Sequence, residues 1–167
     1  GLNAGEEFET KIFVKVNIAE VLRRELARPS WAGEPVALGT ATDCYQPAEA
    51  RYRLTRRCLE LFACFRTPIS LVTKGTMVLR DLDVLQALTA RAGATVYFSV
   101  PTLDRELWRR TEPGTPPPEQ RLRVMERLVA AGIHAGVLLA PLLPGLSATP
   151  AQIERTVRAA AAHGARF

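Results

Sequence analysis

One repeated unit constrains the fold of this chain more than any other feature: a short apolar run, followed by a stretch whose apolar residues have helical spacing. Runs of β-forming residues occur at 12–16, 36–40, 69–74, 94–100 and 134–141, and a sixth begins at Arg166. Successive runs lie about 24 to 39 residues apart, which is the length that a right-handed strand-helix-strand crossover needs. The strands are therefore expected to be parallel.

The polar residues at the ends of these runs favour a barrel over an open sheet. No Gly-x-Gly-x-x-Gly motif follows any run, which argues against a dinucleotide-binding sheet. In a barrel, alternate strand residues point inward and can be polar near the carboxyl rim. Ser70 and Lys74 share one face of their strand, Thr95 and Ser99 share one face of the next, and each series ends in a polar group.

The predicted fold class is therefore α/β, a partial parallel (β/α)6 barrel that is TIM-barrel-like. Nothing in the sequence separates two domains, so residues 1–167 are expected to form one barrel fragment. The chain begins with Gly rather than Met and ends as a further strand starts. We expect truncation at both ends.

Composition bounds the class of protein. With 47% hydrophobic and 23% charged residues, the chain is expected to form a packed globular core. No apolar run approaches the roughly 18 residues of a membrane span, and no signal segment opens the chain. We expect a cytoplasmic protein without a membrane partner. Of the 22 basic residues 19 are Arg, and they are spread over several helices, so the net charge of +5 permits binding to nucleic acid without requiring it.

The lysines are more informative than the arginines. Lys11, Lys15 and Lys74 all fall in or at the ends of predicted strands. Where almost every other cation is Arg, a strand lysine suggests a need for a compact ammonium on a flexible stem. Lys74 is the strongest of the three as a binding residue, because it lies at the expected carboxyl rim.

A polar loop follows the second predicted strand and contains Thr40, Thr42, Asp43 and Tyr45. Ligands of parallel α/β proteins bind in loops at the carboxyl ends of strands, so these residues are candidates for a binding site. The structural alternative is that Thr42 or Asp43 only caps the turn.

The cysteines form no recognisable ligand pattern. Cys44, Cys58 and Cys64 are separated by 14 and 6 residues, which matches no disulfide framework and no metal or cluster motif. Cys58 is expected in the core, whereas Cys44 lies in the polar loop and is either near a ligand or inert.

Six segments, in this order, resemble radical S-adenosylmethionine proteins of the spore-photoproduct-lyase-like branch, and particularly its uncharacterised bacterial members. They are Gly39-Thr-Ala-Thr-Asp-Cys-Tyr-Gln-Pro-Ala-Glu49, Leu71-Val-Thr-Lys-Gly75, Tyr97-Phe-Ser-Val100, Glu112-Pro-Gly-Thr115, Ala130-Ala-Gly-Ile133 and Val137-Leu-Leu-Ala-Pro-Leu-Leu-Pro-Gly145. Each segment is short, but their order and spacing make the resemblance fairly specific.

The resemblance implies a barrel that binds S-adenosylmethionine at a [4Fe-4S] cluster and generates a 5′-deoxyadenosyl radical, which takes a hydrogen atom from a substrate that the sequence does not reveal. It implies that Lys74 pairs with the methionine carboxylate and that Ser99 contacts the bound cofactor. Thr42 and Asp43 occupy the place of the residues that hold the amino group. A reducing partner such as flavodoxin or ferredoxin is also implied.

The chain departs from the family pattern in two respects. Thr42 and Asp43 stand where the family usually has Gly-Gly-Glu, and, as the larger departure, the chain contains no Cys-x3-Cys-x2-Cys loop. We expect these cluster ligands upstream of Gly1, in which case the fragment alone is inactive and the full-length protein is the enzyme. The alternatives are a degenerate relative that has lost the chemistry, or a non-catalytic relative that binds nucleic acid, which the excess of arginines would favour. A further alternative is an aldolase-type barrel in which Lys74 forms a Schiff base.

Residues of the crossover after the fourth predicted strand are expected to contribute little. Glu112 and Arg121 are interpreted as solvated surface, although both could reach a cofactor. His134 and His163 border predicted elements and are expected to be exposed.

Overall fold

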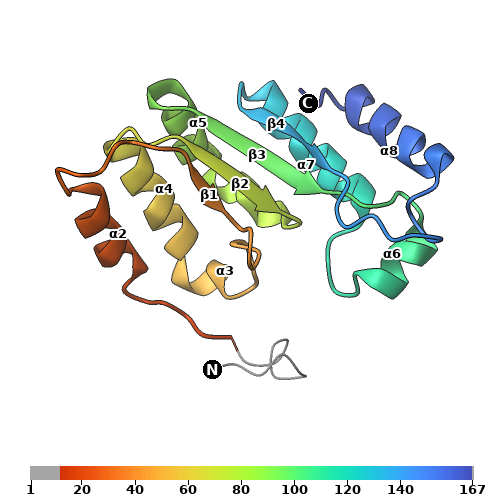
Figure 1. The fold of residues 1–167 in the computed structure, drawn as a ribbon, viewed down its shortest axis with the longest axis horizontal. Coiled ribbons are helices and arrows are strands. Elements are labelled where there is room, and N and C mark those ends of the chain that lie inside the picture. The colour runs from red at the N-terminus through yellow and green to blue at the C-terminus, as the bar shows by residue number, and fades with distance from the viewer. Residues whose placement is uncertain (1–11, 167) are drawn as a thin grey trace.

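A parallel sheet of four strands organises the computed structural model, which describes residues 12–166. The strands are β1 (Val36–Leu38), β2 (Ile69–Thr73), β3 (Ala94–Ser99) and β4 (His134–Leu138), and they lie in that order across the sheet (Figure 1). Ser70 pairs with Thr95, and Tyr97 with Gly136. All carboxyl ends therefore meet at one edge, as the crossover lengths predict.

Helical crossovers connect the strands. The helices are α2 (Ile18–Leu26), α3 (Glu49–Tyr52), α4 (Leu54–Cys64), α5 (Leu82–Arg91), α6 (Arg105–Thr111), α7 (Pro118–Ala130) and α8 (Pro150–Ala162), and a 3-10 helix, η1, spans Thr76–Asp81. Pro118 occupies the first turn of α7, where its missing N–H costs no hydrogen bond, and Thr149 caps α8 by accepting a hydrogen bond from the Gln152 amide.

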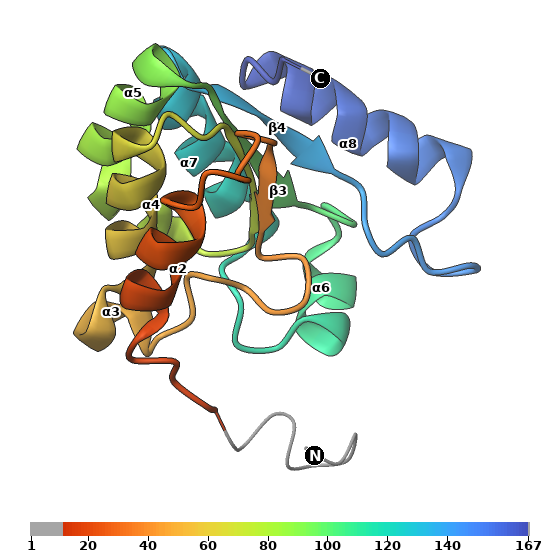
Figure 2. The same ribbon diagram turned by 60° about the vertical axis from the view of Figure 1, so that its left-hand side comes forward.

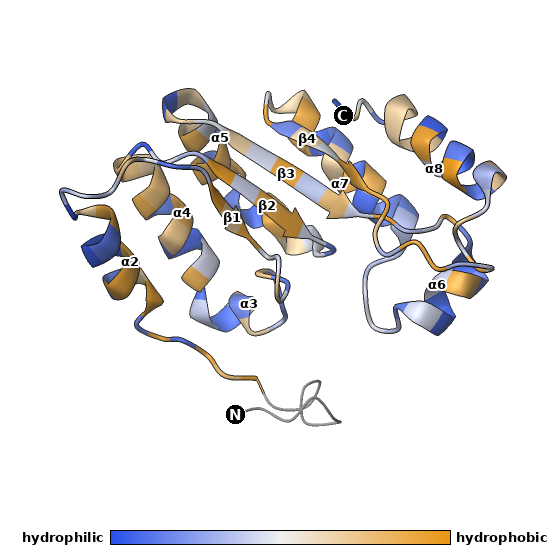
Figure 3. Cartoon of the chain, in the orientation of Figure 1, coloured by the Kyte–Doolittle hydropathy of each residue, from blue (hydrophilic) through white to orange (hydrophobic). Residues whose placement is uncertain are grey.

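One face of the sheet carries most of the hydrophobic core. Helices α4, α5 and α7 cover that face, and α2 packs on the outside of α4 (Figure 2). Burial alternates along β2, where Leu71 and Thr73 are buried while Ser70 and Val72 are only partly covered. Strands β1 and β2 are largely hydrophobic, and the helices alternate hydrophobic and hydrophilic turns (Figure 3). The alternating burial along the strand places one face of β2 against the helices and leaves its other face more open.

The strand predicted at residues 12–16 is wrong. The side chains of Ile12 and Phe13 are 56% and 72% exposed, and this stretch has no strand assignment. Its backbone makes local turns instead, since the Val16 amide donates to the Val14 carbonyl and the Ile18 amide to the Lys15 carbonyl. A β-forming sequence becomes a strand only where a neighbouring strand accepts its hydrogen bonds. Lys15 is therefore not a strand lysine, and Lys11 lies outside the described residues.

Two other predicted elements differ in detail. The helix predicted after the second strand is broken into α3 and α4 at Arg53, whose φ of 51° is left-handed. The sixth strand, expected at Arg166, has no strand assignment in the described residues, although the Arg166 amide donates to the Ala135 carbonyl of β4 at 3.1 Å. That hydrogen bond is where a further parallel strand would add to the sheet.

Candidate functional site

Asp43 ties the loop after β1 to the end of β2. Its Oδ1 accepts hydrogen bonds from the Tyr45 amide at 2.9 Å and from the Thr73 hydroxyl at 2.7 Å, and its Oδ2 accepts one from the Lys74 amide at 2.7 Å. The carboxylate thus makes contact with the backbone of the very residue that was predicted to bind the cofactor. Asp43 is placed to fix the direction in which the Lys74 side chain leaves the sheet.

Close packing of glycines leaves this edge little freedom. Gly39 has a φ of +79°, and a Cβ built on it would lie 2.1 Å from the Val72 carbonyl oxygen. A Cβ on Gly75 would lie 2.9 Å from the Tyr45 Cβ. The polar loop therefore lies directly on β2 and the turn that follows it, and larger residues at positions 39 and 75 would push these segments apart.

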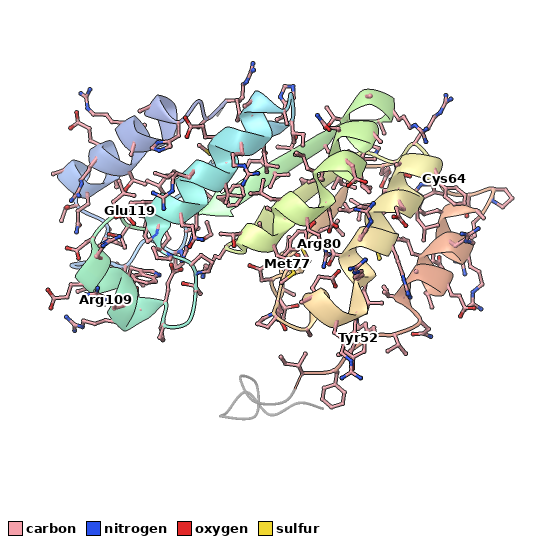
Figure 4. All side chains as sticks on the ribbon, turned by 180° about the vertical axis from the view of Figure 1, so that it is seen from behind. Tyr52, Cys64, Met77, Arg80, Arg109 and Glu119 are labelled. Carbon is pink, nitrogen blue, oxygen red and sulfur yellow. The ribbon has the colours of Figure 1, made fainter. Side chains whose placement is uncertain are left out.

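A buried charged network supports the loop from behind. Asp81 is fully buried, and its carboxylate accepts hydrogen bonds from the Tyr45 hydroxyl at 3.0 Å and from Arg80 at 2.9 and 3.0 Å. Arg80, which lies beside Met77 on η1 (Figure 4), also donates to the Glu49 carboxylate at 3.1 Å. Burial, followed by the Asp81 charge, raises the pKa of Tyr45 above its usual value. The loop that carries Asp43 is thereby held rigidly.

Glu49 explains the break between α3 and α4. Its two carboxylate oxygens accept hydrogen bonds from the Leu54 and Thr55 amides, each at 3.0 Å, and so cap the start of α4. The Thr55 hydroxyl donates to the Cys44 carbonyl at 2.6 Å. A helix that ran unbroken through Arg53 would bury these amide donors in intrahelical bonds and release the carboxylate from its partners.

Lys74 follows β2 directly, and its side chain is 33% exposed. Its ammonium lies 2.7 Å from Glu112 Oε1, and Glu112 Oε2 lies 2.7 Å from an Nη of Arg121. The Glu112 oxygens are buried, and neither contact is aligned as a hydrogen bond, so the attachment is electrostatic. The interpretation of Glu112 and Arg121 as solvated surface is wrong, because the two side chains are only 6% and 0% exposed.

Arg121 is anchored independently of Glu112. Its guanidinium donates to the Ser99 carbonyl at 2.7 Å, to the Pro116 carbonyl at 2.8 Å and to the Thr115 hydroxyl at 2.7 Å. The first of these acceptors belongs to the last residue of β3, so the buried cation joins the strand end to the crossover that precedes α7. The long loop over residues 112–117, which the sequence marks only by its prolines, is a fixed part of the edge.

The other predicted site residues lie at the same edge but in different surroundings. Ser99 ends β3, is 7% exposed and donates its hydroxyl hydrogen bond to the Ala140 carbonyl at 2.5 Å. Thr42 is exposed in the loop after β1. Lys74, Asp43 and Ser99 are thus brought to the carboxyl edge together. A role of Lys74, Asp43, Ser99 or Thr42 in cofactor binding remains a prediction.

Two hollows flank the sheet at opposite edges. One of about 450 Å³ lies at the amino ends of the strands and is lined by Pro68, Thr95 and His134, among others. The other, of about 260 Å³, lies at the carboxyl edge between Thr102, Glu112 and Pro141. The smaller hollow is lined by Glu112, the carboxylate that contacts Lys74. Ligands of parallel α/β sheets bind at this edge.

The cysteines of the described chain do not fit an iron–sulfur cluster. Burial raises the pKa of Cys44 to about 12 and that of Cys58 to about 11, so both are protonated thiols in the folded chain at neutral pH. Cys64 is exposed at the far end of α4 from α3 (Figure 4). Within residues 12–166, no three His, Cys, Asp or Glu side chains gather as a metal site, and no helix is long and apolar enough to cross a membrane.

Comparison with known families decides the relationship. The sequence pattern of the radical SAM superfamily matches residues 9–160, which is most of the chain. This chain belongs to the radical SAM superfamily. Membership implies S-adenosylmethionine and a [4Fe-4S] cluster as cofactors.

Relatives and solved structures agree with the membership. Uncharacterized proteins of Mycobacterium tuberculosis and Mycobacterium bovis are each 42% identical over 163 residues, which is 98% of this chain and 48% of theirs. An uncharacterized protein of Methanocaldococcus jannaschii is 24% identical over 135 residues, 81% of this chain and 49% of its own length. The chain thus spans about half the length of the curated relatives it matches.

The fold resembles that of spore photoproduct lyase. A complex of that enzyme with dinucleoside spore photoproduct has a TM-score of 0.61 at 19% identity, covering 80% of this chain and 38% of the lyase chain. A mutant lyase with bound AdoMet and the same dinucleoside has a TM-score of 0.66 at 19% identity, with coverages of 92% and 46%. The predicted class, an α/β radical SAM fold that is TIM-barrel-like, is confirmed, as is the likeness to the spore-photoproduct-lyase-like branch.

The sequence did not predict that Glu112 contacts both Lys74 and Arg121 at the carboxyl edge of the sheet. Glu112 is 13 residues beyond Ser99 and follows α6, and Arg121 lies inside α7 among other arginines, so neither has a local signal. The one available clue is position within a family-like segment, Glu112-Pro-Gly-Thr115, whose Thr115 binds Arg121. A contact that joins two crossovers through a buried carboxylate cannot be read from periodicity.

Proposed function

We propose that this chain, residues 1–167, is one core domain and forms the S-adenosylmethionine-binding part of a radical SAM enzyme, in which Lys74 holds the methionine carboxylate. The observation that carries the proposal is the family match over residues 9–160, together with a partly open ammonium at the carboxyl edge of the sheet. When bound at a reduced cluster, the cofactor supplies a 5′-deoxyadenosyl radical that removes a hydrogen atom from a substrate.

The surroundings of Lys74 fit an anionic ligand group. The side chains of Lys74, Glu112 and Arg121 carry two positive charges and one negative charge, so the cluster has an excess of +1. An ammonium has three donors, and Lys74 keeps part of its surface open while it contacts Glu112. A carboxylate could approach the exposed side of the ammonium without displacing Glu112. Charge-assisted hydrogen bonds of this kind contribute about 1.5–3 kcal/mol each.

Two residues of the loop after β1 would have different roles in the same site: Asp43 would support Lys74, and Thr42 would bind the cofactor. Asp43 positions the Lys74 backbone through its Oδ2. Thr42 is exposed, so its hydroxyl could accept a hydrogen bond from the amino group of the cofactor. Ser99 would contact the cofactor through the lone pairs of a hydroxyl whose hydrogen is directed at Ala140. Ligation of the cluster itself is proposed for residues outside this chain, with an electron donor of the flavodoxin or ferredoxin type.

The test is binding of S-adenosylmethionine to the protein that carries this chain, with its cluster reconstituted anaerobically. Lys74→Met is expected to weaken binding about tenfold or more, because it removes a charge-assisted contact. Lys15→Met is the matched control, since Lys15 is exposed and lies away from the strands, and it should bind as the wild type does. The proposal fails if the cluster-loaded protein neither binds S-adenosylmethionine nor forms 5′-deoxyadenosine.

A nucleic acid is the second candidate, either as the substrate of this enzyme or as the ligand of a non-catalytic relative. The two neighbouring lyase structures hold a dinucleoside photoproduct. In this chain the arginines at positions 105, 109 and 110 are exposed on α6, which follows the carboxyl end of β3, and Figure 4 labels Arg109 among them. Affinity for DNA that falls steeply with salt would support this reading. A salt-independent affinity, or none, would remove nucleic acid from consideration.

The Schiff-base alternative is weaker. Imine formation needs a neutral, desolvated amine, whereas Lys74 is partly exposed and lies 2.7 Å from a buried carboxylate. Borohydride trapping with small aldehydes should therefore leave Lys74 unmodified.

A further inference from the structure

We infer that Glu112 is the positioning residue for Lys74, and that Arg121 is the counter-charge that lets Glu112 do this without cancelling the positive charge offered to the ligand. This inference rests on the proposed function and adds to it two residues from the crossover between β3 and β4. Glu112 does not touch the cofactor in this scheme. It acts by fixing the ammonium that does.

The contact geometry distinguishes the two cations. Arg121 is completely buried, whereas the Lys74 side chain is 33% exposed, and each lies 2.7 Å from a different oxygen of Glu112. Arg121 also donates to three further acceptors, so it cannot swing out to a ligand. Lys74 is the one of the pair that can face both Glu112 and a ligand.

The charges of the cluster explain why a carboxylate beside Lys74 does not block an incoming carboxylate. A buried Glu112 paired only with Lys74 would neutralise it and would repel a second anion. The Arg121 charge, at the same distance from Glu112, offsets the carboxylate and leaves the ammonium charge uncompensated. The cluster is therefore a preorganised cation rather than a closed salt bridge.

The backbone of Glu112 is itself fixed, so the carboxylate is a firm support. The Glu112 amide donates to the Trp108 carbonyl at 2.8 Å, and the Thr115 hydroxyl donates to the Glu112 carbonyl at 2.7 Å. The Trp108 indole in turn donates to the Thr115 hydroxyl at 3.1 Å. Without this support Lys74 would sample several rotamers, and binding would have to restrict them.

The experiment compares two ligands on four forms of the cluster-loaded protein. The ligands are S-adenosylmethionine and 5′-methylthioadenosine, which shares the adenosine and the sulfur but has no amino-acid carboxylate. The forms are the wild type, Glu112→Gln, Lys74→Met and the double variant, with Glu119→Gln as matched control. Glu119 pairs with Arg105 on the surface, away from Lys74.

Glu112→Gln is expected to weaken S-adenosylmethionine binding about tenfold, which corresponds to ~1.4 kcal/mol, and to leave 5′-methylthioadenosine binding unchanged. In the Lys74→Met background the same substitution should have no effect on either ligand. Glu119→Gln should match the wild type throughout. Glu112→Asp, which keeps the charge but withdraws the oxygen from Lys74 by about one bond length, ~1.5 Å, should show a smaller loss for S-adenosylmethionine alone.

Several results would overturn the inference. Unchanged or tighter S-adenosylmethionine binding in Glu112→Gln would show that the carboxylate does not position Lys74. An equal loss of affinity for both ligands would show that Glu112 has only a structural role. If Glu112→Gln does not fold, Glu112→Asp decides by the same comparison. Failure of the proposed function looks different: Lys74→Met would then bind S-adenosylmethionine as the wild type does, whatever Glu112→Gln does.

Discussion

Replacing Asp43 by Asn should loosen the edge of the sheet that carries Lys74. The carboxylate accepts hydrogen bonds from two amides and one hydroxyl, at 2.7 to 2.9 Å. An Asn that keeps its carbonyl oxygen at the Oδ1 position retains the Tyr45 and Thr73 donors but turns an NH2 group toward the Lys74 amide. One hydrogen bond to a charged acceptor is then lost, and the two others become neutral. Because a bond to a charged group is worth ~1.5–3 kcal/mol, we expect the free energy of unfolding to fall by ~2–3 kcal/mol.

Urea denaturation followed by far-UV circular dichroism measures this change. With a slope of ~2 kcal/mol per molar urea, the midpoint should shift down by about 1 M. Asp83→Asn is the matched control, since the Asp83 side chain is 66% exposed and its ion pair with Arg56 is a surface contact. Such pairs contribute ~0–1 kcal/mol, so the control should shift by less than about 0.5 M. A midpoint for Asp43→Asn no lower than that of Asp83→Asn would refute the reasoning.

Three further predictions concern Gly39 and the cysteines. Gly39→Ala should lower the melting temperature sharply or prevent folding, because its Cβ would lie 2.1 Å from the Val72 carbonyl oxygen, whereas Gly114→Ala, with open space around it, should cost far less in the same thermal melt. Iodoacetamide at pH 8 should modify the exposed Cys64 in the native protein. Cys44, whose pKa is raised to about 12, should react only after unfolding. Mass spectrometry that finds both cysteines labelled at equal rates would contradict this. Stability should fall as the pH rises above about 9, because the Cys44 thiol ionises in the unfolded chain before it does in the folded one, and Cys44→Ala should reduce this alkaline loss in a series of urea melts.

Local sequence patterns predicted strands correctly where a neighbouring strand lies beside them. The runs that became β2, β3 and β4 lie beside neighbouring strands, and Pro118 starts α7 as its fixed φ requires. The run at 12–16 has the same β-forming composition but makes local turns instead. Propensity predicted a strand correctly only where tertiary pairing supplied the partner.

The candidate site shows the same division. Lys74 and Ser99 were placed at one edge because strand parity and a shared direction suffice for that. The partners of Lys74 could not be predicted, because Glu112 reaches it from a crossover whose path depends on the Arg121 anchor and on the Trp108 and Thr115 hydrogen bonds. The Lys74–Glu112 and Arg121–Ser99 contacts join residues far apart in the chain, and the Trp108 and Thr115 hydrogen bonds belong to an irregular loop, so none of them leaves a periodic trace.

Two carboxylates contact Lys74, one at its backbone and one at the end of its side chain, and this difference determines what each can control. Asp43 binds the amide and so sets where the side chain starts, while Glu112 contacts the ammonium and so sets where it ends. Loss of the first displaces the whole edge and should affect both folding and every ligand, whereas loss of the second releases the ammonium of Lys74 and leaves the buried Arg121 without its carboxylate partner. A site that must present a single cation to a carboxylate needs both constraints, because a lysine side chain fixed at one end alone keeps most of its rotamer freedom.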